Sequence, residues 1–112
     1  MHIVNLTPHA LNIVTDSGTV TIPPSGIVAR CSVRRERVGE VGGIPVNRTV
    51  FGDVEGLPEP TADTYYIVSA IVAQACPDRS DLLITDDAVR DEQGRIIGCR
   101  ALATVSREWE ED

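Results

Sequence analysis

Apolar and polar residues alternate along most of this chain, and short clusters of turn-forming residues interrupt the alternation. Residues 11–15 and 19–22 carry β-branched side chains on either side of an Asp-Ser-Gly turn at 16–18, which predicts a β-hairpin. A shorter apolar run at residues 3–6 ends at Thr-Pro-His, where proline cannot continue a ladder, and predicts a short strand. The beginning of the chain is therefore predicted to be β-structure.

The longest strand-like stretch covers residues 27–41. Glycines at 39, 42 and 43 interrupt it, and residues 44–51 are predicted to pair with it as a second hairpin. Residues 52–60 contain several glycines and prolines and predict a loop. The alternation predicts a half-buried strand whose arginines face solvent or a ligand. One parity carries Ile27, Ala29, Cys31 and Val33, and the other carries Val28, Arg30, Ser32 and Arg34.

The most apolar segment covers residues 64–76. Residues 65–68 are typical of a strand, and Ser69 is a good N-cap for a short helix that Pro77 would end. In that helix Ile71, Val72 and Ala75 are expected to bury one face. The alternative is a single continuous strand over the whole segment.

The C-terminal part predicts a further short strand and a hairpin. Residues 82–85 form the strand, and residues 88–90 and 95–99 flank a turn in which Gly94 supplies a positive φ. Residues 101–105 are expected to extend the last strand.

These elements predict a mainly β fold, a small barrel or sandwich of about seven short strands, with one short helix after Ser69. A length of 112 residues corresponds to one domain. We assign residues 1–106 to a single β-rich domain. Residues 107–112 form an acidic C-terminal tail that is not expected to pack.

The charge of the chain bears on its partners. Acidic residues outnumber basic ones 17 to 10, and the net charge is −7. Binding to nucleic acids or to anionic membranes needs clustered cations, so neither class of partner is expected. The first residues lack the pattern of a secretory signal, and no apolar run reaches membrane-spanning length. We therefore expect a cytoplasmic protein.

Cysteine and aspartate spacings predict neither a metal site nor a cofactor site. Cys31, Cys76 and Cys99 are odd in number and form no Cys-x-x-Cys pair, so neither a disulfide framework nor a structural zinc site is expected. Their apolar neighbours indicate small buried hydrophobes. Four aspartates between residues 78 and 87 do not have the spacing of a calcium loop.

Every one of the ten basic residues is arginine. A GC-rich genome is one explanation, and the use of guanidinium forks to bind phosphate or carboxylate is the other. Arg30 and Arg34 lie on one face of the predicted strand and are candidate ligand-binding residues; Arg35 and Arg37 fall on the other face. The alternative is a solvated strand edge, where charge discourages edge pairing.

A second group of candidate ligand-binding residues follows the apolar segment and comprises Ser69, Gln74, Arg79, Ser80 and Asp81. A helix that begins at Ser69 would offer backbone amides to an anion, and Arg79 would add a two-pronged contact. Asp81 would accept hydrogen bonds from hydroxyl or amine groups of a nucleotide. The alternative is that Ser69 is an ordinary cap and that Arg79 pairs with an aspartate at the surface.

His9 is the remaining candidate. Its imidazole could hydrogen-bond a ligand or act as a base, and the alternative is a turn histidine that satisfies a local carbonyl. The sequence has no Gly-x-Ser-x-Gly elbow and no glycine-rich phosphate loop followed by lysine. A non-enzymatic protein is therefore expected.

Several segments together resemble a family of small uncharacterised proteins from bacterial and phage genomes, and the likeness covers nearly the whole chain. The resemblance implies a small intracellular protein carried by mobile elements, and it brings no catalytic residues with it. The segments are Asn5-Leu6-Thr7-Pro8-His9, Pro24-Ser25-Gly26, Gly56-Leu57-Pro58, Tyr66-Ile67-Val68-Ser69, Val72-Ala73-Gln74 and Arg90-Asp91-Glu92 with Gly94 and Ile96-Ile97-Gly98-Cys99.

Three functions follow as hypotheses. The leading one is a non-enzymatic binding protein, a phage-type anti-defence sponge that sequesters a small anionic or nucleotide-like signal. A homo-oligomer is expected to be able to form such a pocket between its subunits. The first alternative is a protein-interaction module that inhibits or adapts a host or virion protein. The second alternative is a small enzyme that uses His9.

Overall fold

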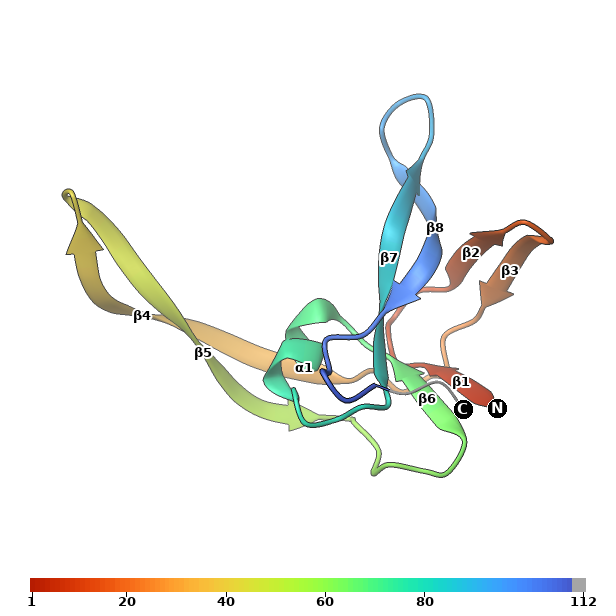
Figure 1. The fold of residues 1–112 in the computed structure, drawn as a ribbon, viewed down its shortest axis with the longest axis horizontal. Helices are drawn as coiled ribbons and strands as arrows, with labels where there is room; N and C mark the ends of the chain where they lie inside the picture. Colours follow the sequence, from red (N-terminus) through yellow and green to blue (C-terminus); the bar gives the residue numbers. More distant parts are fainter. Residues whose placement is uncertain (110–112) are drawn as a thin grey trace.

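The chain divides into a six-stranded sheet and a separate two-stranded ribbon (Figure 1). The computed structural model describes residues 1–109. A mainly β fold with one short helix is confirmed. Its elements are β1 (His2–Asn5), β2 (Leu11–Thr15), β3 (Gly18–Ile22), β4 (Arg30–Val41), β5 (Ile44–Glu55), β6 (Thr64–Ile67), α1 (Ala70–Ala75), β7 (Leu82–Arg90) and β8 (Ile96–Ala103).

The six-stranded sheet has the order β1-β6-β7-β8-β2-β3 and curls into a half-barrel. β1, β6 and β7 are parallel neighbours, and β2 lies parallel to β8. The hairpins β2–β3 and β7–β8 are antiparallel. Parallel neighbours need a crossover connection, and α1 lies within the one that joins β6 to β7. The sheet is therefore mixed, and its two edges are β1 and β3.

Both predicted hairpins of the sheet are present. β2 and β3 pair from Leu11↔Ile22 to Thr15↔Gly18, and Gly18 has a φ of +121° at the turn. In the second hairpin the two short stretches predicted within residues 82–90 are one strand, β7. Its turn is closed by Asp91, whose carboxylate accepts backbone hydrogen bonds from Gln93 and Arg95 at 2.9 and 3.0 Å.

The helix prediction is confirmed and the continuous-strand alternative is wrong. Ser69 is the N-cap of α1, and its hydroxyl accepts a 3.3 Å hydrogen bond from the Val72 amide. The buried residues of the helix are Val72 and Ala73. Ile71, predicted to be buried, is exposed because the helix is tucked against the sheet by its other side. One apolar side chain of α1 therefore remains open to solvent.

The ribbon of β4 and β5, which we call the arm (residues 30–55), differs from the predicted hairpin at its base: β4 begins at Arg30 instead of residue 27, and β5 runs past residue 51. Gly42 and Gly43 form its two-residue turn with φ of +57° and +80°, as primed hairpin turns require. β5 continues to Glu55, so the loop prediction for residues 52–55 is wrong. Gly52 does not break the strand; it makes room for Ser32, whose side chain would collide with a Cβ at that position.

The core consists of two apolar clusters on opposite sides of β6. Successive residues of a strand point to opposite faces, and β6 follows this rule. Tyr66 belongs to a cluster that contains Val72, Ala73 and Leu82 from α1 and β7. Tyr65 and Ile67 pack with Leu83, Leu11, Ile22 and Leu102 on the other side. Three of the four residues of β6 thus supply side chains to the two clusters.

Only the root of the arm joins this core. Ala29 is buried, and Cys31 and Val54 pack against the helix-side cluster. Beyond the root every residue of β4 is exposed, so the prediction of a half-buried strand is wrong from Val33 onward; in the facing part of β5 only Val50 is half-buried. The arm extends the molecule along its longest axis (Figure 1). The radius of gyration is 16.3 Å, whereas a compact chain of this length has about 13 Å.

Trp109, the last described residue, lies next to Tyr65 of β6. The Trp109 ring lies 6.3 Å from that of Tyr65, so the prediction that the tail does not pack is wrong at this residue. The rest of the predicted tail, residues 110–112, lies outside the described residues. Within residues 1–109, no helix has the length and apolar character needed to cross a membrane.

Asn5 is the buried polar residue that connects the ends of several strands. Its amide nitrogen donates to the carbonyls of His9, at 2.8 Å, and Ile22, at 3.2 Å. Its carbonyl oxygen accepts from the backbone amide and the hydroxyl of Thr7, at 2.9 and 2.6 Å. The end of β1, the turn that follows it and the end of β3 are therefore held by a single side chain.

We predict that Asn5→Ala lowers the free energy of unfolding by about 2–3 kcal/mol, because it leaves buried backbone groups without partners. Urea denaturation monitored by circular dichroism measures the change. Asn47→Ala is the matched control, since Asn47 is exposed on the arm. Equal stability of the two variants would contradict the role given to Asn5.

Candidate functional site

Seven of the eight residues predicted to bind a ligand line four surface hollows of the molecule. His9 lines one hollow, and Ser80 and Asp81 line another. Arg30 and Ser69 come together in a third, and Arg34 and Gln74 in a fourth. The third and fourth hollows share Ile71, so the arm and the helix bring four of the eight residues to one region.

Arg79 is largely buried and hydrogen-bonds to other residues of the protein. Its guanidinium makes two 2.8 Å hydrogen bonds to the Asp81 carboxylate and a third, at 3.0 Å, to the carbonyl of Pro58. The two side chains are 20% and 16% exposed. Donating these hydrogen bonds to Asp81 raises the pKa of Arg79 further above its usual range. Arg79 thus pairs with an aspartate, as in the alternative above, but in a largely buried position.

The start of α1 does not form an anion site. The Ser69 hydroxyl is used as a cap, and the helix has only six residues. Ser69 contributes to a surface instead, because its exposed side faces the root of the arm across the hollow that contains Arg30. The hydrogen bonding of Ser69 is therefore that of an ordinary helix cap, as the alternative prediction stated.

Two neighbouring hollows lie between the arm and α1, and together we call them the arm-base groove. Its two halves have volumes of about 660 and 570 Å³ and meet at Ile71. The residues that line it include Arg30, Val33, Arg34, Arg35, Phe51, Ser69, Ile71 and Gln74. Strand pairing places Val33 opposite Phe51 and Arg35 opposite Thr49 on one face of the ribbon. That face is turned toward Ile71 and Gln74 of the helix.

The two halves of the groove differ in charge. In the inner half, Arg30 lies near Asp53 and Glu55, and β-pairing places Arg30 directly opposite Glu55. The outer half is lined by two arginines and by no carboxylate: Arg35 shares the ribbon face of Val33, and Arg34, one residue earlier, belongs to the opposite face of the strand. Arg34 makes one loose ion pair, 3.7 Å from Glu36, and within residues 1–109 no ion pair involves Arg35. The outer half is therefore the electropositive one.

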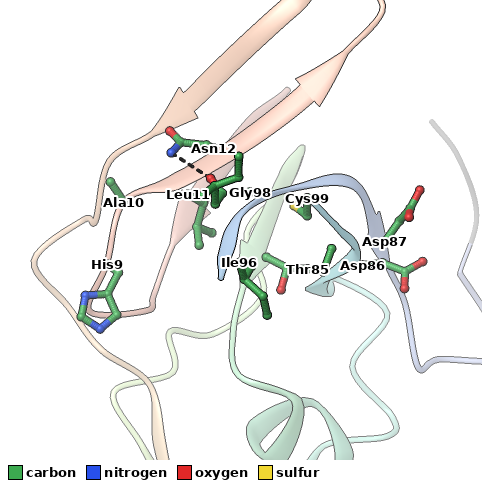
Figure 2. Close-up of a pocket in the computed structure, with 12 residues that line it drawn as sticks. His9, Ala10, Leu11, Asn12, Thr85, Asp86, Asp87, Ile96, Gly98 and Cys99 are labelled. Atoms are coloured by element: carbon green, nitrogen blue, oxygen red, sulfur yellow. Dashed lines mark hydrogen bonds between the residues drawn. The ribbon is translucent and has the colours of Figure 1, made fainter. Parts of the chain in front are cut away.

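His9 lies in a different hollow, of about 770 Å³, between the start of β2 and the β7–β8 hairpin. Figure 2 shows its imidazole on one side of this hollow and Asp86 and Asp87 on the other, with Ile96 between them. The backbone carbonyl of His9 accepts the hydrogen bond from Asn5. The described residues contain no nucleophile hydrogen-bonded to its ring, as a catalytic pair would require.

The cysteines do not supply an activated nucleophile. All three are free, and Cys99 is buried. Burial raises the pKa of the Cys76 thiol, an effect that the nearby Arg79 only partly opposes. A raised pKa disfavours the reactive thiolate. In the described part of the chain, no group of three or more His, Cys, Asp or Glu residues is placed to hold a metal ion.

Arg35, Phe51 and Ile71 were missed as site residues by sequence reasoning. Arg35 was placed on the face opposite Arg30 and Arg34, and Phe51 and Ile71 were read as strand and helix core. The available signal was the alternation itself, which gives Val33 and Arg35 the same parity. It did not show that this face would meet a helix some 35 residues later in the chain.

Comparison with known proteins adds no relative. No protein-family model matches the chain, and no curated protein or solved structure is significantly similar to it. The resemblance to small bacterial and phage proteins therefore stays a prediction, and the site is defined by its geometry.

We predict that Arg79→Ala lowers the free energy of unfolding by about 1–3 kcal/mol, because Asp81 keeps a largely buried charge without a partner. Chemical denaturation measures the loss. Arg95→Ala is the control: its ion pair with Asp91 is exposed on the arginine side, and such pairs contribute about 0–1 kcal/mol. If the two variants were equally stable, the Arg79–Asp81 pair would have no structural importance.

Proposed function

We propose that this protein is a non-enzymatic binding protein that captures a small anionic, nucleotide-like ligand in the arm-base groove. The observation that carries the proposal is the outer half of the groove, where Arg34 and Arg35 lie with an exposed aromatic ring and no carboxylate. In a chain with a net charge of −7, such a region attracts anions selectively.

The arginines supply the anion contacts. A guanidinium presents several N–H donors in a planar fork that matches phosphate or carboxylate oxygens. Arg35 has no ion pair within residues 1–109 that a ligand would need to break, and the pair made by Arg34 is long and exposed. An anion that binds either arginine would therefore break little existing interaction within the protein.

Phe51 and Gln74 favour a nucleotide over a simple anion. Phe51 is one of only four aromatic residues in the chain, and its ring is exposed beside Val33 and Ile71. An exposed aromatic ring offers a stacking surface for a base. Gln74 can donate and accept hydrogen bonds at the polar edge of such a base. Arginine forks next to an aromatic ring are the combination that a nucleotide requires.

The biological setting rests on the predicted family resemblance alone. A small protein of phage or bacterial mobile elements that binds a nucleotide without turning it over acts as a sponge, which lowers the free concentration of a host signal. A protein-interaction module is the second candidate, and the uncovered arm favours it. The third hypothesis is an enzyme that uses His9. In the described residues, no hydrogen bond of the His9 ring supports this hypothesis.

We predict that titration calorimetry against cyclic dinucleotides, cyclic mononucleotides and ADP-ribose derivatives finds a ligand with a submicromolar Kd. Arg35→Ala should weaken that ligand about tenfold or more, because a charge-assisted hydrogen bond is lost. Phe51→Leu should weaken the nucleotide but not inorganic pyrophosphate, because only the base stacks. Arg95→Ala, an exposed arginine outside the groove, is the control that should bind normally.

The proposal fails if no compound in the panel binds more tightly than micromolar. It also fails if binding is tight but indifferent to Arg35→Ala, since the site would then lie elsewhere. Chromatography of the ligand after incubation with the protein should return it unchanged, and a converted product would show that the protein is an enzyme.

A further inference from the structure

The tip of the arm is apolar and uncovered. Val41 and Ile44 flank the glycine turn and are 70% and 68% exposed. The pairings Val41↔Ile44 and Gly39↔Val46 place Val41, Ile44 and Val46 on one face of the ribbon. An isolated two-stranded hairpin is marginally stable in water, and exposed aliphatic side chains add to that cost. A tip of this composition is suited to insertion into an apolar hollow.

The arm behind the tip is opposite in charge to the rest of the chain, whereas the tip itself carries one charged residue, Glu40, which lies 3.5 Å from Arg37. Residues 34–48 contain four arginines and two glutamates, a net charge of +2, in a chain whose total is −7. The remainder therefore carries −9. Two copies of this protein repel each other through their bodies, whereas the arm of one copy is attracted to the body of another.

The body offers one hollow that matches both the apolar tip and the charge of the arm behind it. The β2–β8 hollow, the one that contains His9, has a volume of about 770 Å³. Its walls include Leu11, Ala88, Ile96 and Ile97, and both isoleucines are exposed. Asp86 and Asp87 lie together on one side (Figure 2). Arg100 is 3.7 Å from Asp87, and no ion pair within residues 1–109 involves Asp86.

The arm cannot reach this hollow within its own molecule. The arm tip and the β2–β3 side of the sheet lie at opposite ends of the longest axis, which spans 51 Å (Figure 1). The arm leaves its root in the direction away from β2 and β8. Any arm that fills the hollow must therefore come from another molecule.

We propose that the arm tip of one copy docks into the β2–β8 hollow of a second copy. Val41 and Ile44 would enter against Ile96 and Ile97, and the arginines behind the tip would approach Asp86 and Asp87. The contact joins two different surfaces, so it produces a reciprocal dimer, a closed ring or, where the rotation does not close, an open filament. It does not depend on the ligand of the arm-base groove, because it uses other residues at the far end of the arm.

Sedimentation velocity and light scattering over a micromolar concentration series test this contact. The wild-type protein should have a mass above that of the monomer, and high salt should weaken the assembly because the charges at its interface are partly exposed. The tip variant Val41→Ser/Ile44→Ser should dissociate at concentrations about tenfold or more higher than the wild type does. The hollow variant Asp86→Asn/Asp87→Asn should also weaken association.

Two controls make the result specific. Val20→Ser/Ile27→Ser removes the same residue types from positions that are each 53% exposed and lie outside the tip and the hollow, so it should assemble normally. A mixture of the tip variant with the hollow variant should form complexes, because the former keeps an intact hollow and the latter an intact tip. A wild-type monomer at all concentrations, normal assembly of the tip variant, or failure of the mixture would each overturn the proposal.

Discussion

A two-stranded ribbon has two faces and no interior, and this constraint determines what the rest of the molecule can do. The arm spans 26 residues, and only its root contacts the apolar core. Everything beyond the root must be solvated or covered by something else. The arginines suit the first condition, and the valines and isoleucines of the tip suit the second. Both proposed contacts, the ligand in the arm-base groove and the docked tip, therefore lie on the arm.

The body holds the root of this arm in a fixed place. The amide of Ala29 donates to the carbonyl of Leu6 at 3.0 Å, so the chain enters the arm along the edge of β1. The chain leaves the arm at Gly56, where a Cβ would collide with the carbonyl of Val28 and where φ is +78°. Only glycine allows this close approach. Because both ends are tied to the core, α1 meets the same face of the ribbon and forms the arm-base groove.

Local sequence patterns predicted which residues form strands and the helix, but they did not predict what each element packs against. The hairpins followed from parity and turn residues, and the helix from Ser69 as a cap before a proline. Each of these signals lies within about twenty residues of sequence. The sequence could not show that the arm would be bare, since alternation indicates strand pairing but not what covers the faces.

The candidate site depended on long-range contacts and was predicted only in part. Arg30, Arg34, Ser69 and Gln74 do come together, because the arm root and α1 pack on one cluster. Arg79 was predicted to bind an anion because it is an arginine beside a helix, but Asp81 and the Pro58 carbonyl occupy it. Whether a charged side chain is free or paired is a property of the folded chain, and no local pattern encodes it.

Amide hydrogen exchange across a protein concentration series tests the central claim, that the arm functions by being covered. If the claim is correct, peptides from residues 38–46 become more protected as concentration rises, together with peptides from residues 85–88 and 96–99, while those of β3 do not change. Exchange in the arm that is equally fast at every concentration, with no protection in either region, would contradict it.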